Sequence, residues 1–367
     1  MMATVAKPSP INSAFAPMSA RRVLIFGGIA LVAGGMLFGD VFAVFILHQN
    51  AGQQGAALIA ANQAVAAGDE AAVNRIFASL GSLLEDRGTK VDAHVHMIGA
   101  GYLALLLALV QPFIVLGART KKILAALFIA GGTLLPIGIF LIHYVGLTYS
   151  PFAVIGWASI LADSAGALLI IVLVAEAWGF RRYIRTREPA EPTLPEDNSW
   201  ERRTLLSGGT LLILLGFLHG AWYAGAYLYQ HERMETDILQ NMMTSAAAND
   251  LVAASAQVGD FGNLAGAHAV NIAAHSHIIE FGLLAMLLSL VQPYIFLSER
   301  WKRRWTQILL AGSVILPVFV LLELKLGLLA AGIADIGGLM VIVALIAMLV
   351  GVLRYTGTLD ASTGGAS

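Results

Sequence analysis

Long runs of apolar residues recur along the chain, separated by shorter polar segments. Eight of the runs are long enough to cross about 30 Å of hydrocarbon as helices. They cover residues 23–48, 93–117, 122–146, 152–178, 204–230, 273–297, 305–324 and 328–353. The pattern predicts an all-α integral membrane protein with eight transmembrane helices.

The polar segments between these runs predict the domain organisation. Segments 49–92 and 231–272 are long, contain few prolines, and are rich in Ala, Gln, Asn and Asp, which favours short amphipathic helices. Segment 183–202 is polar, carries three prolines, and indicates a linker. We therefore expect a four-helix repeat over 1–182, a cytoplasmic linker over 183–202, and a second four-helix repeat over 203–367.

The second half of the chain repeats the first. The string AHVHMIGAGYLALLLALVQP (93–112) aligns with AHSHIIEFGLLAMLLSLVQP (274–293), at an offset of 181 residues. After a shorter outer turn, LADSAG (161–166) aligns with IADIGG (333–338). Each half holds four predicted helices, so the chain returns to the same side before the second half begins. We therefore expect two parallel repeats related by a pseudo-symmetry axis along the membrane normal.

Basic residues predict the orientation. Arg21, Arg22, Lys121, Lys122 and most of the basic residues in 181–203 and 299–304 fall on one side of the predicted membrane. The positive-inside rule then places both termini in the cytoplasm of a multi-pass protein of the cell membrane. The composition agrees, because only 12% of the residues are charged and mean hydropathy is +0.77. A net charge of −1 gives no indication of nucleic acid, and membrane lipids are the expected surroundings.

Histidine and acidic residues gather near the predicted outer ends of the helices. Two His-x-His pairs begin the second and sixth helices, and the other candidates lie at a similar depth. The candidate ligands are His94, His96, His143, Asp163, His275, His277, Glu280 and Asp335, with Glu323 beside them. Ionisable residues inside a span are costly and usually face a partner or a cavity. Imidazole near carboxylate suits haem iron, copper or non-haem iron. The chain has no cysteine, which excludes disulfides, thiolate sites and covalent c-type haem.

The same pattern is compatible with structural roles. A His-x-His pair at a helix start is typical of rings at the headgroup level. Residues two apart point about 200° apart on a regular helix, so one histidine is expected to face the bundle and the other to cap the loop. Asp163 and Asp335 would then bond to a neighbouring helix. The glycines Gly27, Gly28, Gly34, Gly35 and Gly39 have a spacing that suits close helix packing.

The layout resembles haem A synthase, which has eight spans in two parallel four-helix halves with long outer loops after the first and fifth helices. The resemblance covers nearly the whole chain and implies haem b or a similar haem bound by His94, His96, His275 and His277. The fourth and eighth helices carry Asp163 and Asp335 where that family has histidines. The family's Glu-x-x-His-Arg signature and loop cysteines are absent, which argues against haem A synthesis itself.

The string A-H-x-H-x-x-x-x-G (93–101 and 274–282) is also similar to that of small four-helix membrane proteins related to haem–copper oxidase subunit I. Together these observations predict a haem- or metal-binding redox protein, an electron-transfer or oxidoreductase subunit, with its site near the extracytoplasmic face. Copper or non-haem iron are the alternatives to haem. The expected partners are a quinol or an extracytoplasmic electron carrier, and a homo-oligomer or a membrane complex is consistent with them.

Two other classes of function stay open, and so does the question of whether the chain is an enzyme. The first class is a proton- or cation-coupled transporter or channel, in which the histidines and carboxylates bind the ion. The second is a non-catalytic subunit or sensor that docks a partner through its outer helical loops.

Overall fold

The computed structural model describes residues 19–43, 45, 48–145, 157–186 and 199–354. These residues are almost entirely helical, and no strand occurs among them. Eight of the described helices are long and apolar enough to cross a membrane. They are α1 (Ala20–Phe42), α3 (Glu70–Val110), α4 (Ala118–Val145), α5 (Trp157–Thr186), α6 (Trp200–Trp222), α8 (Leu251–Val291), α9 (Glu299–Leu326) and α10 (Leu328–Arg354). The prediction of an all-α, multi-pass membrane protein is confirmed.

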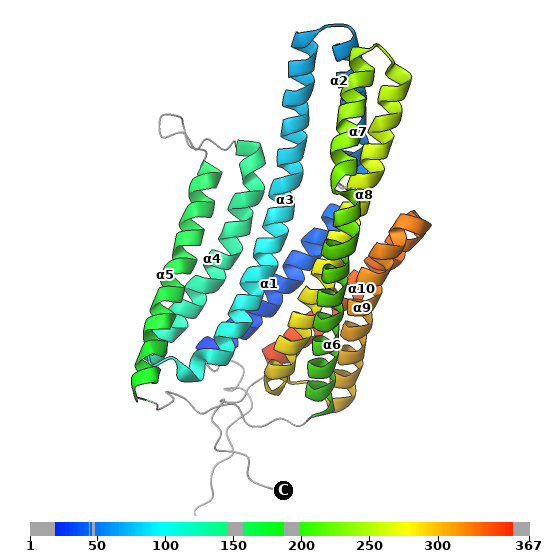
Figure 1. Cartoon of the computed structure of the whole chain (residues 1–367). Helices are drawn as coiled ribbons and strands as arrows, with labels where there is room; N and C mark the ends of the chain where they lie inside the picture. Colours follow the sequence, from blue (N-terminus) through cyan, green and yellow to red (C-terminus); the bar gives the residue numbers. More distant parts are fainter. Residues whose placement is uncertain (1–18, 44, 46–47, 146–156, 187–198, 355–367) are drawn as a thin grey trace, which may run out of the picture.

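The two long outer segments form helical hairpins. The first arms are α2 (His48–Ala66) and α7 (Tyr229–Ala247), and the second arms are the upper parts of α3 and α8. Each of these two helices runs for 41 residues, about 60 Å at 1.5 Å per residue, twice the thickness of the hydrocarbon. Their upper parts therefore project beyond the span, as Figure 1 shows.

Local sequence explains where these long helices begin. Gly68 and Asn249 adopt positive φ angles of 69° and 60°, which turn the chain at the tip of each hairpin. The next residue caps the following helix: Asp69 accepts from Ala72 N at 2.9 Å, and Asp250 accepts from Ala253 N at 3.0 Å. No proline follows until the helices end, so each continues from the hairpin through the span.

At their lower ends α3 and α8 stop at the same motif. Gln111–Phe113 and Gln292–Tyr294 each form a single 3₁₀ turn with proline in its second position. The chain then passes against the last helix of its own half. Val115 N donates to Gly179 O at 3.2 Å in the first half, and Phe296 N donates to Gly351 O at 3.0 Å in the second.

Glycine allows the closest helix contacts inside each half. A Cβ on Gly28 would lie 2.9 Å from the Gly101 carbonyl oxygen, between α1 and α3. A Cβ on Gly209 would lie 2.6 Å from the Gly282 oxygen, between α6 and α8. Because only a residue without Cβ permits this approach, the predicted role of the glycines in packing holds at these positions.

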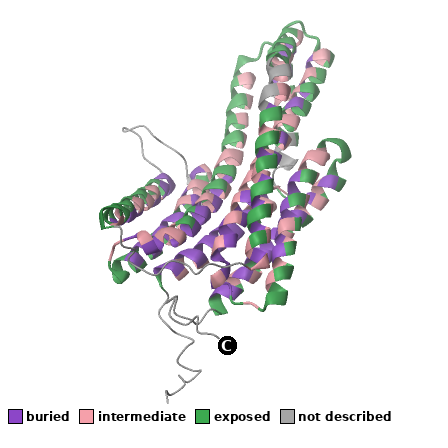
Figure 2. Cartoon of the chain, turned by 60° about the horizontal axis from the view of Figure 1, so that its bottom comes forward, coloured by how far each residue is buried: buried purple, intermediate pink, exposed green. Residues whose placement is uncertain are grey.

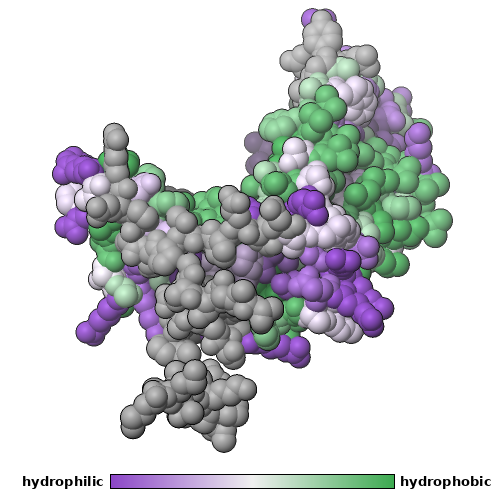
Figure 3. Space-filling view, turned by 90° about the horizontal axis from the view of Figure 1, so that it is seen from below, coloured by the Kyte–Doolittle hydropathy of each residue, from purple (hydrophilic) through white to green (hydrophobic). Residues whose placement is uncertain are grey.

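The halves meet along α1 and α10, with α3 against α8 and α2 against α7 and α8. Helix α5 packs on α4 at the outer edge of the first half. Figure 2 shows that buried residues concentrate in the lower helical body and that the hairpins are largely exposed. Figure 3, seen from the end at which α1, α6 and α9 begin, shows hydrophilic side chains at this end and hydrophobic ones over the flanks.

Candidate functional site

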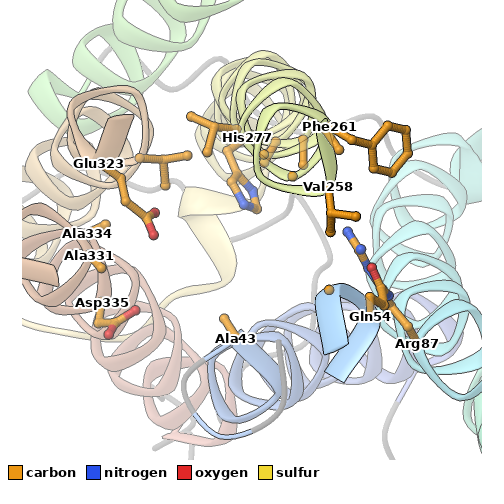
Figure 4. Close-up of a pocket in the computed structure, with 18 of the residues that line it drawn as sticks. Ala43, Gln54, Arg87, Val258, Phe261, His277, Glu323, Ala331, Ala334 and Asp335 are labelled. Carbon is orange, nitrogen blue, oxygen red and sulfur yellow. The ribbon is translucent and has the colours of Figure 1, made fainter. Parts of the chain in front are cut away.

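A cavity of about 410 Å³ lies between the two halves, at the level where the outer hairpins meet the spans. Its walls come from α2, α3, α8, α9 and α10, together with Ala43 after α1 (Figure 4). Most of the lining is small or apolar. The polar and charged lining residues are Gln54, Arg87, His277, Glu323 and Asp335. A few polar groups in an apolar hollow are typical of a ligand pocket.

The polar groups stand on opposite walls. In Figure 4, Gln54 and Arg87 lie together on one side, and Glu323 and Asp335 lie together on the other. The imidazole of His277 projects from α8 into the space between them. Gln54 Nε2 is buried and has no hydrogen-bond partner. One wall therefore offers donors to a bound acceptor, and the other carries acids.

Asp40 adds a third carboxylate from α1 at the acidic side. A Cβ on Gly338 of α10 would lie 2.9 Å from Asp40 Oδ1, so the carboxylate sits directly against α10. Asp40 also interacts electrostatically with Asp335. Two carboxylates from different halves therefore lie close together toward the hairpin end of the spans, an arrangement that is costly in lipid and usually functional.

His277 and His96 hold equivalent positions in the repeat, but their surroundings differ. The His277 ring stacks on Phe281, with ring centroids 5.8 Å apart and planes 14° apart, and it interacts electrostatically with His94 of the other half. His96 is exposed, and its Nδ1 bonds within its own helix to Asp92 O at 2.7 Å. Of these two histidines, His277 is the one that faces the cavity.

His94 and His275 make the same contact in both halves. His94 Nδ1 donates to Gly35 O at 2.6 Å, and His275 Nδ1 donates to Gly216 O at 3.0 Å. A carbonyl oxygen accepts only, so the proton sits on Nδ1 and Nε2 keeps its lone pair. A backbone bond of this kind commonly orients a histidine ligand. Each ring also lies against a glycine of the first helix, Gly39 or Gly220.

A chain of rings runs outward from His275 in the second half. His219 lies 6.2 Å from His275 between ring centroids, Trp222 lies 5.7 Å from His219, and Tyr227 lies 5.9 Å from Trp222. Tyr227 then stacks on His231 at 4.2 Å and meets His268 at 5.8 Å. The chain crosses the π-helical turn Tyr223–Leu228, a deformation common at functional sites.

His143 belongs to a separate ion network between α3 and α4. Its Nε2 lies 3.4 Å from Asp86 Oδ1, and Asp86 also pairs with Lys90. The Lys90 ammonium is buried and lies 5.7 Å from the Phe140 ring centre and 5.5 Å from that of Tyr144. These contacts explain His143 as part of helix packing.

The remaining predicted residues lie apart from one another. Asp163 is exposed on α5, at the edge of the molecule. Glu280 sits beside Tyr102, whose hydroxyl donates to the Glu280 carbonyl at 3.1 Å. Within the described part of the chain, no three His, Asp or Glu side chains come close enough to hold a metal ion. The structure thus brings His94, His277 and Asp335 to the interface, and leaves His96, His143 and Asp163 elsewhere.

Sequence reasoning did not single out Gln54, Arg87, Trp222 or Tyr227. The first two lie in segment 49–92, for which the sequence predicts amphipathic helices, and the contact between the halves encloses them. The sequence does contain a pattern that predicts the series of rings, because aromatic residues and histidines recur at helical spacing at positions 219, 222, 223, 227 and 231. Comparison with protein-family models, with curated proteins and with solved structures finds no match to this chain.

Proposed function

We propose that the cavity between the halves binds a haem, which His277 would hold, and that the protein carries out electron transfer in the cell membrane. The observation that carries this proposal is the His277 imidazole projecting into an apolar cavity of about 410 Å³. That volume falls within the roughly 300–1,000 Å³ of pockets that take small molecules and cofactors.

The donors on the far wall fit the carboxylate arms of a haem. Arg87 supplies a guanidinium, and Gln54 Nε2 is a buried donor without a partner. An anionic oxygen between them would satisfy the amide and neutralise the guanidinium. The apolar lining from Val258, Phe261 and Leu58 suits the body of a porphyrin.

A haem fits these residues better than a bare metal ion does. A protein site for copper or non-haem iron needs several side-chain ligands, and the described residues do not bring three together. A haem brings four ring nitrogens of its own, so the protein needs to supply only one or two further ligands. We therefore propose haem b in preference to copper or non-haem iron.

The chain's own residues would bind and orient the group. When bound, a haem supplies one-electron redox chemistry. His277 would hold it from α8, while Arg87 and Gln54 fix its direction. His275, on the opposite side of α8, begins the ring chain that ends at His231 and His268 in the outer hairpin. We assign this series of rings as the route toward an extracytoplasmic electron carrier, because the centroids of neighbouring rings in it lie 4.2–6.2 Å apart.

We further propose that the halves are parallel repeats with both termini in the cytoplasm. Equivalent residues make equivalent contacts in both halves: the two histidine–glycine hydrogen bonds, the two glycine pairs and the two 3₁₀ turns. The basic ends of α1, α4, α6 and α9 lie on one side, which supports the cytoplasmic placement.

The experiment that tests the haem proposal is an absorption spectrum of the protein purified in mild detergent, oxidised and then reduced with dithionite. We expect a Soret band with α and β bands that sharpen on reduction, and one haem per chain or fewer by extraction. Incubation with haemin precedes the measurement, so that cofactor loss during purification is repaired. A protein that stays colourless and metal-free after this step contradicts the proposal.

A second function, proton or cation binding, is favoured by the acidic wall. Asp40 interacts with Asp335, and Glu323 lines the same side of the cavity, at the interface of two pseudo-symmetric halves, where transporters bind their ions. Uptake by proteoliposomes with an internal pH-sensitive dye tests it. Transport that Asp335→Asn abolishes and Asp163→Asn leaves intact would establish this function, and a haem-free wild type would then make it the main one.

A further inference from the structure

The seam between α1 and α10 joins the two halves. Gly338 of α10 lies against the Asp40 carboxylate of α1, and Arg22 Nη2 donates to Leu353 O at 2.9 Å. In the repeat, α1 corresponds to α6 and α10 corresponds to α5. A repeat of this kind should therefore carry the same two complementary faces a second time, on α5 and α6.

Helix α6 carries its copy of the face without a cover. On α1, Ile25, Ala33 and Met36 are 0%, 7% and 6% exposed. Their equivalents on α6, Leu206, Leu214 and Phe217, are 40%, 54% and 64% exposed. Leu24 and its equivalent Leu205 are both fully buried, because they face their own half. A shallow groove lined by Leu206, Thr210 and Leu214 marks the uncovered face.

Helix α5 carries the other face, also without a cover. Ile342 of α10 is 3% exposed, and its equivalent Ile170 on α5 is 63% exposed. Val352 is fully buried, and its equivalent Phe180 is 37% exposed. The neighbouring Ile171 is 63% exposed too, but its equivalent Val343 is itself 40% exposed. The loss of burial is thus confined to the side of α5 that matches the seam.

The described structure keeps these two faces apart. Figure 1 shows α5 and α6 on either side of α3 and α4. Helix α5 is locked to α4, where a Cβ on Gly138 would lie 2.6 Å from Ala162 N, and to the turn after α3 through the bond from Val115 N to Gly179 O. Helix α6 is locked to α8 by the Gly209–Gly282 contact. Bringing α5 onto its own α6 would break this packing.

The seam is a head-to-tail contact, because it joins the first helix of one half to the last helix of the other. Such a contact, when it does not close on itself, leaves one complementary face uncovered at each end, here on α5 and on α6. A second copy of the chain supplies both missing partners without disturbing either half. We infer that two copies of this chain pair in the membrane, with α5 of each packing on α6 of the other as α10 packs on α1. This inference rests on the proposed repeat and is independent of any cofactor.

Engineered cysteines test the pairing, because the chain has none of its own. Gly166 and Ala221 are the equivalents of Gly338 and Asp40, which touch in the seam. Both positions tolerate the change, since the nearest atom to a Cβ at Gly166 is 4.0 Å away and Ala221 is exposed. One chain carrying Gly166→Cys and a differently tagged chain carrying Ala221→Cys are co-expressed and oxidised in membranes, so that only a bond between copies can form.

We expect a disulfide-linked species of twice the chain mass that contains both tags. Ser164→Cys is the matched control on α5, because its equivalent Ile336 is 57% exposed and does not face the seam. The yield with Gly166→Cys should exceed that of the control at least ten-fold. Equal yields, or none, would overturn the inference. A disulfide that forms only within a chain carrying both cysteines would overturn it too, because the halves would then close on themselves.

Spin labels give a second readout that needs no bond. Ile170→Cys and Ile171→Cys place the label on adjacent residues with the same exposure in one copy. Pairing should immobilise the label at position 170 and leave the label at position 171 mobile. If both positions contact lipid, the two spectra will be similar, and the inference is contradicted. If the protein binds no haem but still cross-links, the proposed function is contradicted and the inferred pairing is not.

Discussion

The two halves of this chain share their packing and differ in their chemistry. His94 and His275 both donate to a glycine carbonyl of the preceding span, and both halves bring glycine backbones together at the same point. Yet His96 is exposed where its equivalent His277 lines a cavity. Packing inside a half is set by residues within the repeat, whereas exposure of its outer faces is set by what lies next to it.

The two aspartates give the same result. Asp335 on α10 faces the cavity and Asp40, because α10 closes against α1. Its equivalent Asp163 is exposed on α5, which packs on α4 and on the turn after α3. The interface between halves therefore selects which copy of a duplicated residue becomes part of a site.

The largest expected effect concerns the shared packing. Gly101→Ala and Gly282→Ala would each push a Cβ to within 2.7–2.8 Å of a glycine oxygen on the facing helix. Because the close atom belongs to backbone and not to a flexible side chain, each change should cost about 1–3 kcal/mol and lower the unfolding temperature by several degrees. Tryptophan fluorescence during heating in detergent measures this loss.

Gly99→Ala is the control on the same helix, since nothing lies within 4 Å of its Cβ position. It should be neutral or slightly stabilising, because alanine favours a helix over glycine by about 1 kcal/mol. If Gly99→Ala destabilises as much as Gly101→Ala, helix propensity and not close packing explains the glycines.

The next effect should appear in one half only. Lys90 is buried and pairs with Asp86, while the second half has Asn271 at that position, donating to Ala267 O in its own helix. Lys90→Met leaves Asp86 without its cation, and because the Asp86 side chain is 20% exposed, the cost should be about 1–3 kcal/mol. The control Lys302→Met removes a pair with Glu299, whose side chain is 70% exposed, and should change stability by less than about 1 kcal/mol. Equal losses of stability in the two variants would show that the buried Lys90–Asp86 pair stabilises the protein no more than the exposed Lys302–Glu299 pair.

A smaller effect is expected from making the first half resemble the second. His143→Leu installs the residue found at the equivalent position, Leu324, and removes the 3.4 Å contact with Asp86. Asp86 keeps Lys90, so the free energy of unfolding should fall by less than about 1 kcal/mol. Haem content should not change. A loss of haem would place His143 in the site and contradict its assignment to helix packing.

The sequence was enough to predict the spans, the glycine contacts and the duplication of the histidines, because each depends on residues close together or on a pattern repeated in full. On α3, His94 faces the bundle as expected, but His96 does not cap a loop, because it lies inside the continuous helix and bonds to Asp92 O of the same helix. On α8 both histidines are used, since His275 faces α6 and His277 faces the other half.

The cavity could not be predicted in the same way. Its wall combines residues from five helices, and no periodicity within one helix specifies which half it will meet. Arg87 lies on the part of α3 that projects beyond the span, where it would look solvated if the second half were not beside it.

We propose that His277, and not its repeat equivalent His96, would hold a haem. The measurement that tests this is the haem content and Soret band of His277→Ala and His96→Ala, purified and loaded with haemin in parallel with the wild type. We predict that His96→Ala keeps the wild-type spectrum and that His277→Ala loses at least ten-fold in bound haem, with partial recovery when free imidazole is added to fill the space. An unchanged spectrum in His277→Ala, or an equal loss in both variants, would contradict it.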